Sequence, residues 1–256
     1  MVVLKQNLDA QGVLWITLNR PDQCNALNQA LVQALREVFE VQVADSQVRM
    51  VILQGEGRVF CAGVDLKWIQ KARYLEEQAN HQETRFFADL FLKMSQCSKP
   101  LLGVVHGAVL GGGIGLFSVC DIAIAVQGTR FAFSEVRLGL VPACIAPFIL
   151  AKIGLSHARE LFLTGASFDT KRASQMGLIH AEVAQDQLSE VIQGYIQHLL
   201  QGGPRALEAI KSLLRSFDQQ DLASYAHIFA QLRVSPEATE GINCFLKKEK
   251  PSWLLP

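Results

Sequence analysis

The sequence predicts an α/β fold in which a mainly parallel sheet is followed by a helical C-terminal third. The first half of the 256-residue chain alternates short apolar runs, typical of buried strands, with longer segments of helical periodicity. From residue 145 onward the pattern is mostly helical, and no repeat, low-complexity tract or long linker divides the chain. We therefore expect an α/β core over residues 1–195 and a helical region, used for oligomerisation, over residues 196–256.

The strands of the predicted sheet lie in the first half of the chain. Apolar runs predict strands at residues 2–6, 13–18, 50–55, 101–105 and 121–125. The first two are expected to form a hairpin across the turn "DAQG". Segments with apolar residues at helical spacing, at residues 26–42 and 76–95, lie between the later strands and predict crossover helices of a parallel sheet.

Helix start and stop signals divide the C-terminal part. Gly154, Gly165 and Gly177 each follow a helical segment and are typical of helix ends. Ser235-Pro236 combines a capping hydroxyl with a proline in the first turn, which predicts a last helix from there.

Composition excludes several classes of function. The chain has 24 basic and 24 acidic residues, so it lacks the basic surface of a nucleic-acid-binding protein, and a small-molecule partner is favoured. Its six cysteines include no C-x-x-C pair and its histidines no H-E-x-x-H motif, so no metal site is expected. With no signal-peptide pattern at the N-terminus, we expect reduced thiols and a cytoplasmic location.

Residues 101–120 contain no Asp, Glu, Lys or Arg, yet a membrane-spanning helix is rejected there because glycines interrupt the segment, five of them within residues 107–115. These glycines, in "GAVLGGGIG" (107–115), match neither the G-x-G-x-x-G motif nor a Walker loop. Either they pack a helix closely against the sheet, or they expose the first N–H groups of a helix to a substrate carbonyl. The segment "RVFCAGVDLKWI" (58–69) also follows a predicted strand, so both loops are expected at one sheet edge, in the layout of an oxyanion hole.

Five motifs, in order along nearly the whole chain, carry a resemblance. They are "LNRPDQCNAL" (18–27), "FCAGVDLK" (60–67), "HGAVLGGGIGL…CDIAIA" (106–125), "FSEVRLGLVP" (133–142) and "EGINCFLKKEKPSW" (240–253). Together they resemble the enoyl-CoA hydratase/isomerase (crotonase) family, and most of all its bacterial methylglutaconyl-CoA hydratase-like branch. This resemblance implies the crotonase spiral of ββα units and an acyl-CoA substrate that brings CoA with it, with no separate cofactor.

The resemblance also implies site residues. The N–H groups of Val64 and Gly112 are expected to receive the thioester oxygen. The residues expected to bind CoA are Cys24, Ala26, Leu27, Ala62, Asp65 and Leu66, with Lys247 or Lys248 helping at the phosphates. For these two lysines, an ordinary solvated helix end is an equally good interpretation.

Glu135 is the expected catalytic acid and base. It lies among Phe131, Phe133, Val136, Leu138 and Leu140, and burial there would raise the pKa of its carboxyl. On the residues alone, a glutamate between apolar neighbours is more often on an exposed strand face. Its match to the family's catalytic glutamate reverses that preference.

Hydratases of this family use a second glutamate just after the glycine triplet, where this chain has Gly115. We expect Gly115 to remove that side chain and enlarge the pocket. Hydration by the single Glu135 is favoured, with 3-methylglutaconyl-CoA as substrate in leucine or acyclic-isoprenoid breakdown. A Δ3,Δ2-enoyl-CoA isomerase and a non-catalytic acyl-CoA-binding relative are the alternatives.

Two further expectations concern Arg137 and the assembly. Arg137, two residues after Glu135, is a candidate to neutralise a distal substrate carboxylate, although an exposed ion pair with a neighbouring acid is the simpler interpretation. By resemblance, the C-terminal helices assemble homotrimers, or homohexamers as pairs of trimers. Apolar residues give these helices a face to bury: Leu213, Leu214, Phe217, Ile228, Phe229 and Phe245.

Overall fold

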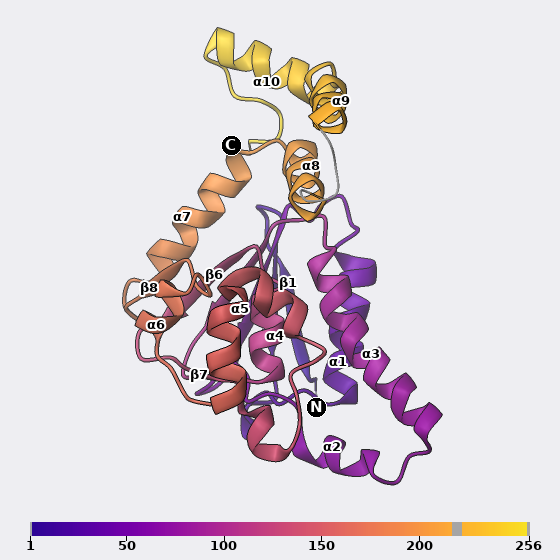
Figure 1. Cartoon of the computed structure of the whole chain (residues 1–256). Helices are drawn as coiled ribbons and strands as arrows, with labels where there is room; N and C mark the ends of the chain where they lie inside the picture. Colours follow the sequence, from indigo (N-terminus) through magenta and orange to yellow (C-terminus); the bar gives the residue numbers. More distant parts are fainter. Residues whose placement is uncertain (1, 217–221, 255–256) are drawn as a thin grey trace.

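The computed structural model describes residues 2–216 and 222–254 and confirms the predicted α/β architecture (Figure 1). Six strands form the central sheet in the order β1-β2-β3-β4-β6-β8. Their bounds are Leu4–Leu8, Val13–Leu18, Met50–Gly55, Leu101–Val105, Ile122–Val126 and Ala181–Val183. Strands β1 and β2 pair antiparallel, and every other neighbouring pair in this sheet is parallel.

The predicted hairpin is present, and Asp9 shapes its turn. The Asp9 carboxylate accepts hydrogen bonds from the N–H groups of Gln11 and Val13 and from the indole of Trp15. A short aspartate at the first turn position satisfies backbone donors that would otherwise be unpaired, which is why such residues favour turns.

Both faces of the sheet are covered by helices, as expected for parallel strands with apolar residues in succession. In β3, Val51 and Leu53 join the larger hydrophobic core, whereas Met50 and Ile52 face the other way and pack in a second core with Ile192 of α7 (Leu188–Gln201). The larger core includes residues of α1 (Gln29–Glu37), α3 (Glu77–Ser95), α4 (Gly112–Ser118) and α5 (Ala146–Thr164).

Several short elements connect these layers. A 3₁₀ turn, η1 (Pro21–Gln23), precedes α1, whose N-cap Asn28 accepts a hydrogen bond from Leu31, and α1 continues into a π-helical turn, η2 (Val38–Gln42). Strands β5 (Ala108–Leu110) and β7 (Arg130–Ala132) form a second, two-stranded parallel sheet. The remaining elements are α2 (Leu66–Ala72), η3 (Ser134–Leu138) and α6 (Thr170–Gln175).

The glycine stop signals are confirmed at Gly165, a left-handed C-cap of α5, and at Gly177, which has a positive φ just after α6. Gly154 instead produces a kink, because the chain resumes its helix immediately and α5 continues to Thr164. The segment 101–120 that was rejected as a membrane span forms β4, β5 and α4. Within residues 2–216 and 222–254, no helix is long and apolar enough to cross a membrane.

The last helices extend away from the sheet (Figure 1). They are α8 (Pro204–Arg215), α9 (Leu222–Arg233) and α10 (Pro236–Lys247), the last with Ser235 as its N-cap, as predicted. Large apolar side chains of this region are exposed, including Leu214, Phe229 and Phe245, while Phe217 lies outside the described residues. The division of the chain near residue 195 stays a prediction, and α7 runs through that residue.

Candidate active site

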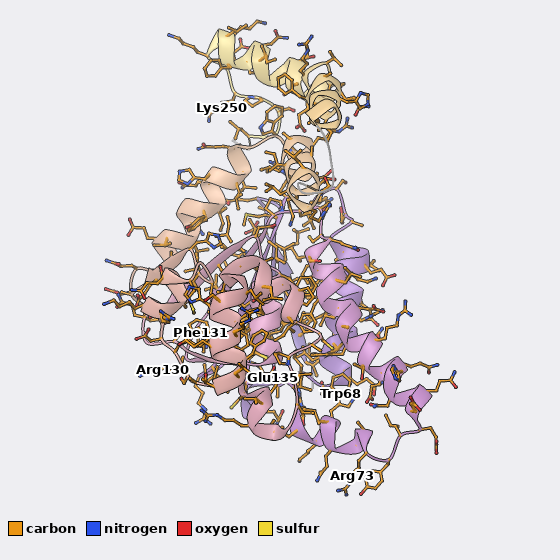
Figure 2. All side chains as sticks on the ribbon, in the orientation of Figure 1. Trp68, Arg73, Arg130, Phe131, Glu135 and Lys250 are labelled. Carbon is orange, nitrogen blue, oxygen red and sulfur yellow. The ribbon has the colours of Figure 1, made fainter. Side chains whose placement is uncertain are left out.

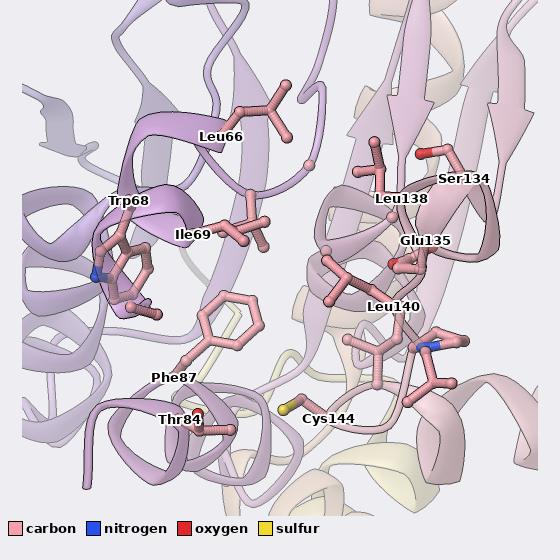
Figure 3. Close-up of a pocket in the computed structure, with 18 of the residues that line it drawn as sticks. Leu66, Trp68, Ile69, Thr84, Phe87, Ser134, Glu135, Leu138, Leu140 and Cys144 are labelled. Carbon is pink, nitrogen blue, oxygen red and sulfur yellow. The ribbon is translucent and has the colours of Figure 1, made fainter. Parts of the chain in front are cut away.

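A cavity of about 820 Å³ lies between the α2–α3 segment and the chain that follows β7. Figure 3 shows Trp68, Ile69 and Phe87 on one wall and Glu135 and Leu140 on the facing wall. Most of the lining is apolar, as in sites for ligands with hydrophobic groups. Val64, Gly112 and Glu135, the three expected catalytic residues, all line this cavity.

Two loops meet at the floor of the cavity, as predicted from their positions after parallel strands. The first is the 60–65 loop, and the second leads through Gly111 into α4. An ideal Cβ at Gly63 would lie 3.8 Å from the Gly112 nitrogen, and one at Gly112 would lie 3.2 Å from Val64 Cγ2. The backbones at positions 63–64 and 112 are therefore packed directly against each other.

Both expected oxyanion donors have free N–H groups. Neither the N–H of Val64 nor that of Gly112 donates a hydrogen bond to any acceptor among the described residues. Gly112 is the first residue of α4, where helical N–H groups lack a partner within the helix. Unpaired N–H donors at a cavity wall can donate hydrogen bonds to a carbonyl oxygen and stabilise the negative charge that develops on it.

Glu135 lies on the 3₁₀ turn η3, on the wall opposite α2 (Figure 3). An ideal Cβ at Gly111 would be 2.8 Å from Glu135 Oε1, so the absent side chain at Gly111 makes room for the carboxylate. Gly111 has φ +45° and ψ −118°, a conformation that favours glycine. Glu135 Oε2 is buried and has no hydrogen-bond partner among the described residues.

Burial raises the pKa of the Glu135 carboxyl above its ordinary value, opposed in part by a hydrogen bond from its own backbone. Desolvation disfavours the charged form, so the group is tuned towards proton exchange nearer neutral pH. A carboxyl with a raised pKa in a cavity is a candidate for acid and base catalysis.

The residues expected to bind CoA lie next to this cavity. Ala62 and Leu66 line it, while Cys24, Ala26 and Leu27 lie in the neighbouring 19–27 loop. The N–H of Ala62 donates to the Cys24 carbonyl at 2.9 Å, which joins the two loops. Asp65 is the N-cap of α2.

Comparison with known proteins identifies the chain's relatives. A family model described as "Enoyl-CoA hydratase/isomerase" matches residues 9–254. The chain belongs to the enoyl-CoA hydratase/isomerase family. It is 32% identical to a 2,3-dehydroadipyl-CoA hydratase of Escherichia coli (strain K12) over 95% of both chains, and 34% identical to the enoyl-CoA hydratase AFT6-1 of Alternaria alternata, over 95% of this chain and 81% of that protein.

Solved structures agree with this assignment and confirm the predicted crotonase fold. Pseudomonas aeruginosa AtuE has a TM-score of 0.94 and 38% sequence identity, with 98% of this chain and 99% of that chain covered. An enoyl-CoA hydratase from Shewanella pealeana also has a TM-score of 0.94, at 33% identity, with 98% and 96% covered. Enoyl-CoA hydratases are enzymes, and acyl-CoA binding is consistent with the family.

The expectation that Gly115 enlarges the pocket of this family member is wrong. An ideal Cβ at Gly115 would lie 2.3 Å from Ile145 Cγ2 and 2.8 Å from Phe91 Cε1. Ile145 and Phe91 are both buried, and Ile145 also lines the cavity. The volume that a side chain at position 115 would need is therefore filled by two apolar side chains.

The environment predicted for Glu135 is correct in part. Phe131 and Phe133 are fully buried, whereas Val136, Leu138 and Leu140 are 40%, 54% and 39% exposed. Because η3 is a turn and no strand, Val136 and Leu138 project from it instead of packing in the core, and Leu140 follows just after its C-cap Gly139. The burial of the carboxylate comes from the cavity wall around Gly111.

Lys247 lies far from the cavity within one chain. It is exposed near the end of α10. Figure 2 shows Lys250, three residues later, near the top of the molecule and far from Glu135 in the lower half. A role for Lys247 at a CoA phosphate stays a prediction, and it requires a neighbouring subunit.

Arg137 lines the cavity and is exposed. No carboxylate of the described residues forms a salt bridge with it, so the simpler interpretation, a surface ion pair, is not observed there. An ideal Cβ at Gly165 would lie 3.2 Å from Arg137 Nε, so the guanidinium packs beside the C-cap of α5.

Sequence reasoning missed Trp68, Phe87 and Ile145 as lining residues. The Trp68 indole donates to Glu83 Oε1 at 2.7 Å, and its ring meets Phe87 edge to face at 5.9 Å. Phe87 and Phe91 lie four residues apart on α3 and are also in edge-to-face contact, which was a detectable helical pair. No local signal marked Ile145.

Among the described residues, no group of three or more metal-binding side chains is found.

Proposed function

We propose that this family member adds water to an α,β-unsaturated acyl-CoA, with Glu135 as acid and base. The observation that carries the proposal is the buried, unpartnered Glu135 carboxylate in the same cavity as two unpaired backbone donors. The N–H groups of Val64 and Gly112 would hold the thioester oxygen, and the 19–27 and 60–65 loops would bind the CoA moiety.

In this mechanism, Glu135 takes a proton from water, and the hydroxide adds to Cβ of the substrate. Electrons move through the double bond onto the thioester oxygen, where two N–H donors stabilise the enolate charge. The proton held by Glu135 then passes to Cα, which restores the thioester and the ionised carboxylate. One carboxylate can serve both transfers because its raised pKa favours exchange in either direction.

For the acyl group we propose a branched dicarboxylate, with 3-methylglutaconyl-CoA as the first candidate. Support comes from Arg137, a cation on the cavity wall with no carboxylate partner among the described residues. The name of the Escherichia coli relative also specifies a dicarboxylic unsaturated thioester. A guanidinium is well suited to bind a terminal carboxylate through two parallel hydrogen bonds.

A second candidate activity is isomerisation between Δ3 and Δ2 enoyl-CoA. The apolar side chains of Ile145 and Phe91 favour it, since they fill the space where a second carboxylate would enter the site. With one carboxylate, removal and return of a proton on the same face of the substrate is the simplest reaction.

We also propose that α8–α10 assemble trimers, or hexamers as pairs of trimers. The exposed side chains of Leu214, Phe229 and Phe245 support this proposal, because large apolar patches on protein surfaces mark interaction sites. Sedimentation equilibrium measures the mass directly, and a monomer at all concentrations would refute it.

The test of the activity uses wild type and Glu135→Gln with crotonyl-CoA, 3-methylglutaconyl-CoA and a 3-enoyl-CoA. Loss of the conjugated thioester absorbance and a product heavier by one water indicate hydration. Glu160 of α5 is an exposed carboxylate that pairs with Arg172 of α6, so Glu160→Gln is the matched control and should keep full activity. Hydration that Glu135→Gln abolishes supports the proposal; conversion of only the 3-enoyl-CoA supports the isomerase, and binding with no turnover refutes both.

A further inference from the structure

The 19–27 and 60–65 loops are joined by a short backbone ladder around Val64. The N–H of Leu27 donates to the Gly63 carbonyl at 2.8 Å, and the N–H of Asp65 donates to the Leu27 carbonyl at 2.9 Å. Leu27 therefore bonds to the residues on both sides of Val64. This pairing leaves the Val64 N–H without an acceptor among the described residues, so the ladder determines where that N–H is directed.

One side chain, that of Arg20, connects both strands of this ladder. Its Nη1 donates to the Ala26 carbonyl, and its Nη2 pairs with Asp65 Oδ2 at 3.1 Å. The other Asp65 oxygen, Oδ1, accepts the N–H of Lys67 at the start of α2. The guanidinium thus spans from the residue before Leu27 to the residue after Val64.

The Arg20–Asp65 pair is shielded from water. Its side chains are 12% and 18% exposed, in contrast to 55% and 47% for the surface pair Lys5–Glu56. Exposed ion pairs contribute little because water and salt screen them, whereas a shielded pair with good geometry holds its partners in place.

Asn25 fixes the base of the same loop. Its side chain is fully buried, and its amide donates to the carbonyls of Glu56 at 2.8 Å and Val59 at 3.0 Å. Its carbonyl oxygen Oδ1 accepts the backbone N–H of Arg20 at 2.8 Å. The Arg20 backbone is therefore held independently, and its side chain reaches the ladder from a fixed point.

We propose that Arg20 is a positioning residue, which through Ala26 and Asp65 holds the Val64 N–H in the orientation that polarises a bound thioester carbonyl. The proposal rests on the oxyanion role of Val64 proposed above. Arg20 itself does not line the cavity, so it acts through the backbone that it orders. A shift of about 1 Å in a catalytic group can cost about 10²-fold in rate.

Replacement by lysine tests the fork geometry at constant charge. An ammonium is a single point of charge and lacks the planar fork that reaches two acceptors at once. Arg20→Lys is therefore expected to keep one contact and lose the other. Asp65→Asn is the complementary variant, because the amide oxygen still accepts the Lys67 N–H while the ion pair is lost.

Each variant is compared with wild type in kcat, KM, melting temperature and an optical signal of carbonyl polarisation. The probe is the CoA thioester of 4-dimethylaminocinnamic acid, whose absorption moves to longer wavelength when its carbonyl is polarised. Arg172→Lys is the matched control, since it makes the same change at the exposed pair with Glu160, which does not line the cavity.

The expected result is a fall in kcat of about tenfold or more for Arg20→Lys and Asp65→Asn, with a smaller red shift of the bound probe at saturation. The double variant should lose less than the product of the two single effects, because both act through one contact. Arg172→Lys should match wild type in kcat and in the red shift.

Two outcomes overturn the inference. One is a red shift and kcat equal to wild type in the folded variants. The other is a lower kcat or melting temperature with the full red shift retained, which would make the pair merely structural. If Arg20→Lys does not fold, Asp65→Asn decides by the same criteria. A wild-type protein that binds the probe with no red shift refutes the proposed oxyanion hole itself, and so separates that failure from failure of the inference.

Discussion

Gly115→Ala should destabilise the protein, although the same change in most helices is stabilising. An alanine in a helix interior is favoured over glycine by about 1 kcal/mol. Here the new Cβ would lie 2.3 Å from Ile145 Cγ2 and 2.8 Å from Phe91 Cε1. Ile145 is buried and β-branched, so it has few alternative rotamers, and overpacking of this kind costs about 1–3 kcal/mol.

The overlap is expected to outweigh the helical gain, which leaves a net loss of up to about 2 kcal/mol in the free energy of unfolding. Gly194→Ala is the matched control, because Gly194 lies inside α7 and an added Cβ meets nothing within 4 Å. Gly194→Ala should therefore gain up to about 1 kcal/mol.

Urea unfolding followed by circular dichroism measures both free energies, with similar m-values expected for the two variants. Gly115→Ala should also couple favourably with Ile145→Ala, which removes the overlapping methyl group. If Gly115→Ala is as stable as Gly194→Ala, the space beside position 115 is open, and the packing described for Ile145 and Phe91 is refuted.

Three further predictions concern the site. Gly112→Pro removes one N–H at the first position of α4, where helices accept proline, and should lower kcat by about 10²–10³. Gly112→Ala adds the same Cβ but keeps its N–H, and should keep most of the activity. Because burial raises the pKa of Glu135, a pH titration of kcat/KM for hydration should show a fall with decreasing pH, at a pKa above that of an ordinary glutamate. In unfolding experiments, Glu135→Gln should be more stable than wild type at pH 8 and should lose this advantage as the pH falls through that pKa. Arg137→Ala should raise KM for 3-methylglutaconyl-CoA about tenfold and leave KM for crotonyl-CoA unchanged; a KM for 3-methylglutaconyl-CoA equal to that of wild type would exclude the carboxylate contact.

The signs for Glu135 follow from linkage. A raised pKa means that the folded state holds the proton more tightly than the unfolded state, so ionisation above that pKa opposes folding. Glutamine is neutral at every pH and avoids this cost. A Glu135→Gln protein that is less stable than wild type at pH 8 would contradict the burial of the carboxylate.

Much of the sheet could be predicted because parallel strands buried on both faces are continuous apolar runs. The bounds of β2, β3 and β4 agree with the prediction to the residue. Strands β5, β7 and β8 were missed, since three-residue strands are too short to show any periodicity. The kink at Gly154 was also missed, because a glycine at that position is compatible with a stop or with a kink.

The residues of the candidate site could be predicted where a sequence motif contains them. Side-chain exposure and contacts that depend on tertiary packing could not. Val64, Gly112 and Glu135 come together as expected. The exposure of Leu138 was not foreseen, because an apolar run alone does not distinguish a buried strand from a turn. The Arg20–Asp65 pair joins residues 45 positions apart, and no local pattern shows such a contact.

The unpaired N–H groups of Val64 and Gly112 belong to the main chain, so no exchange of a side chain, except for proline, can delete them. The position of the proton donor, in contrast, rests on Glu135 and on the side chains that surround it. Activation of the thioester and the fate of the activated intermediate are therefore encoded separately in this chain. Substitution of a few cavity side chains could therefore change the product formed, while the main-chain N–H groups that stabilise the enolate are retained.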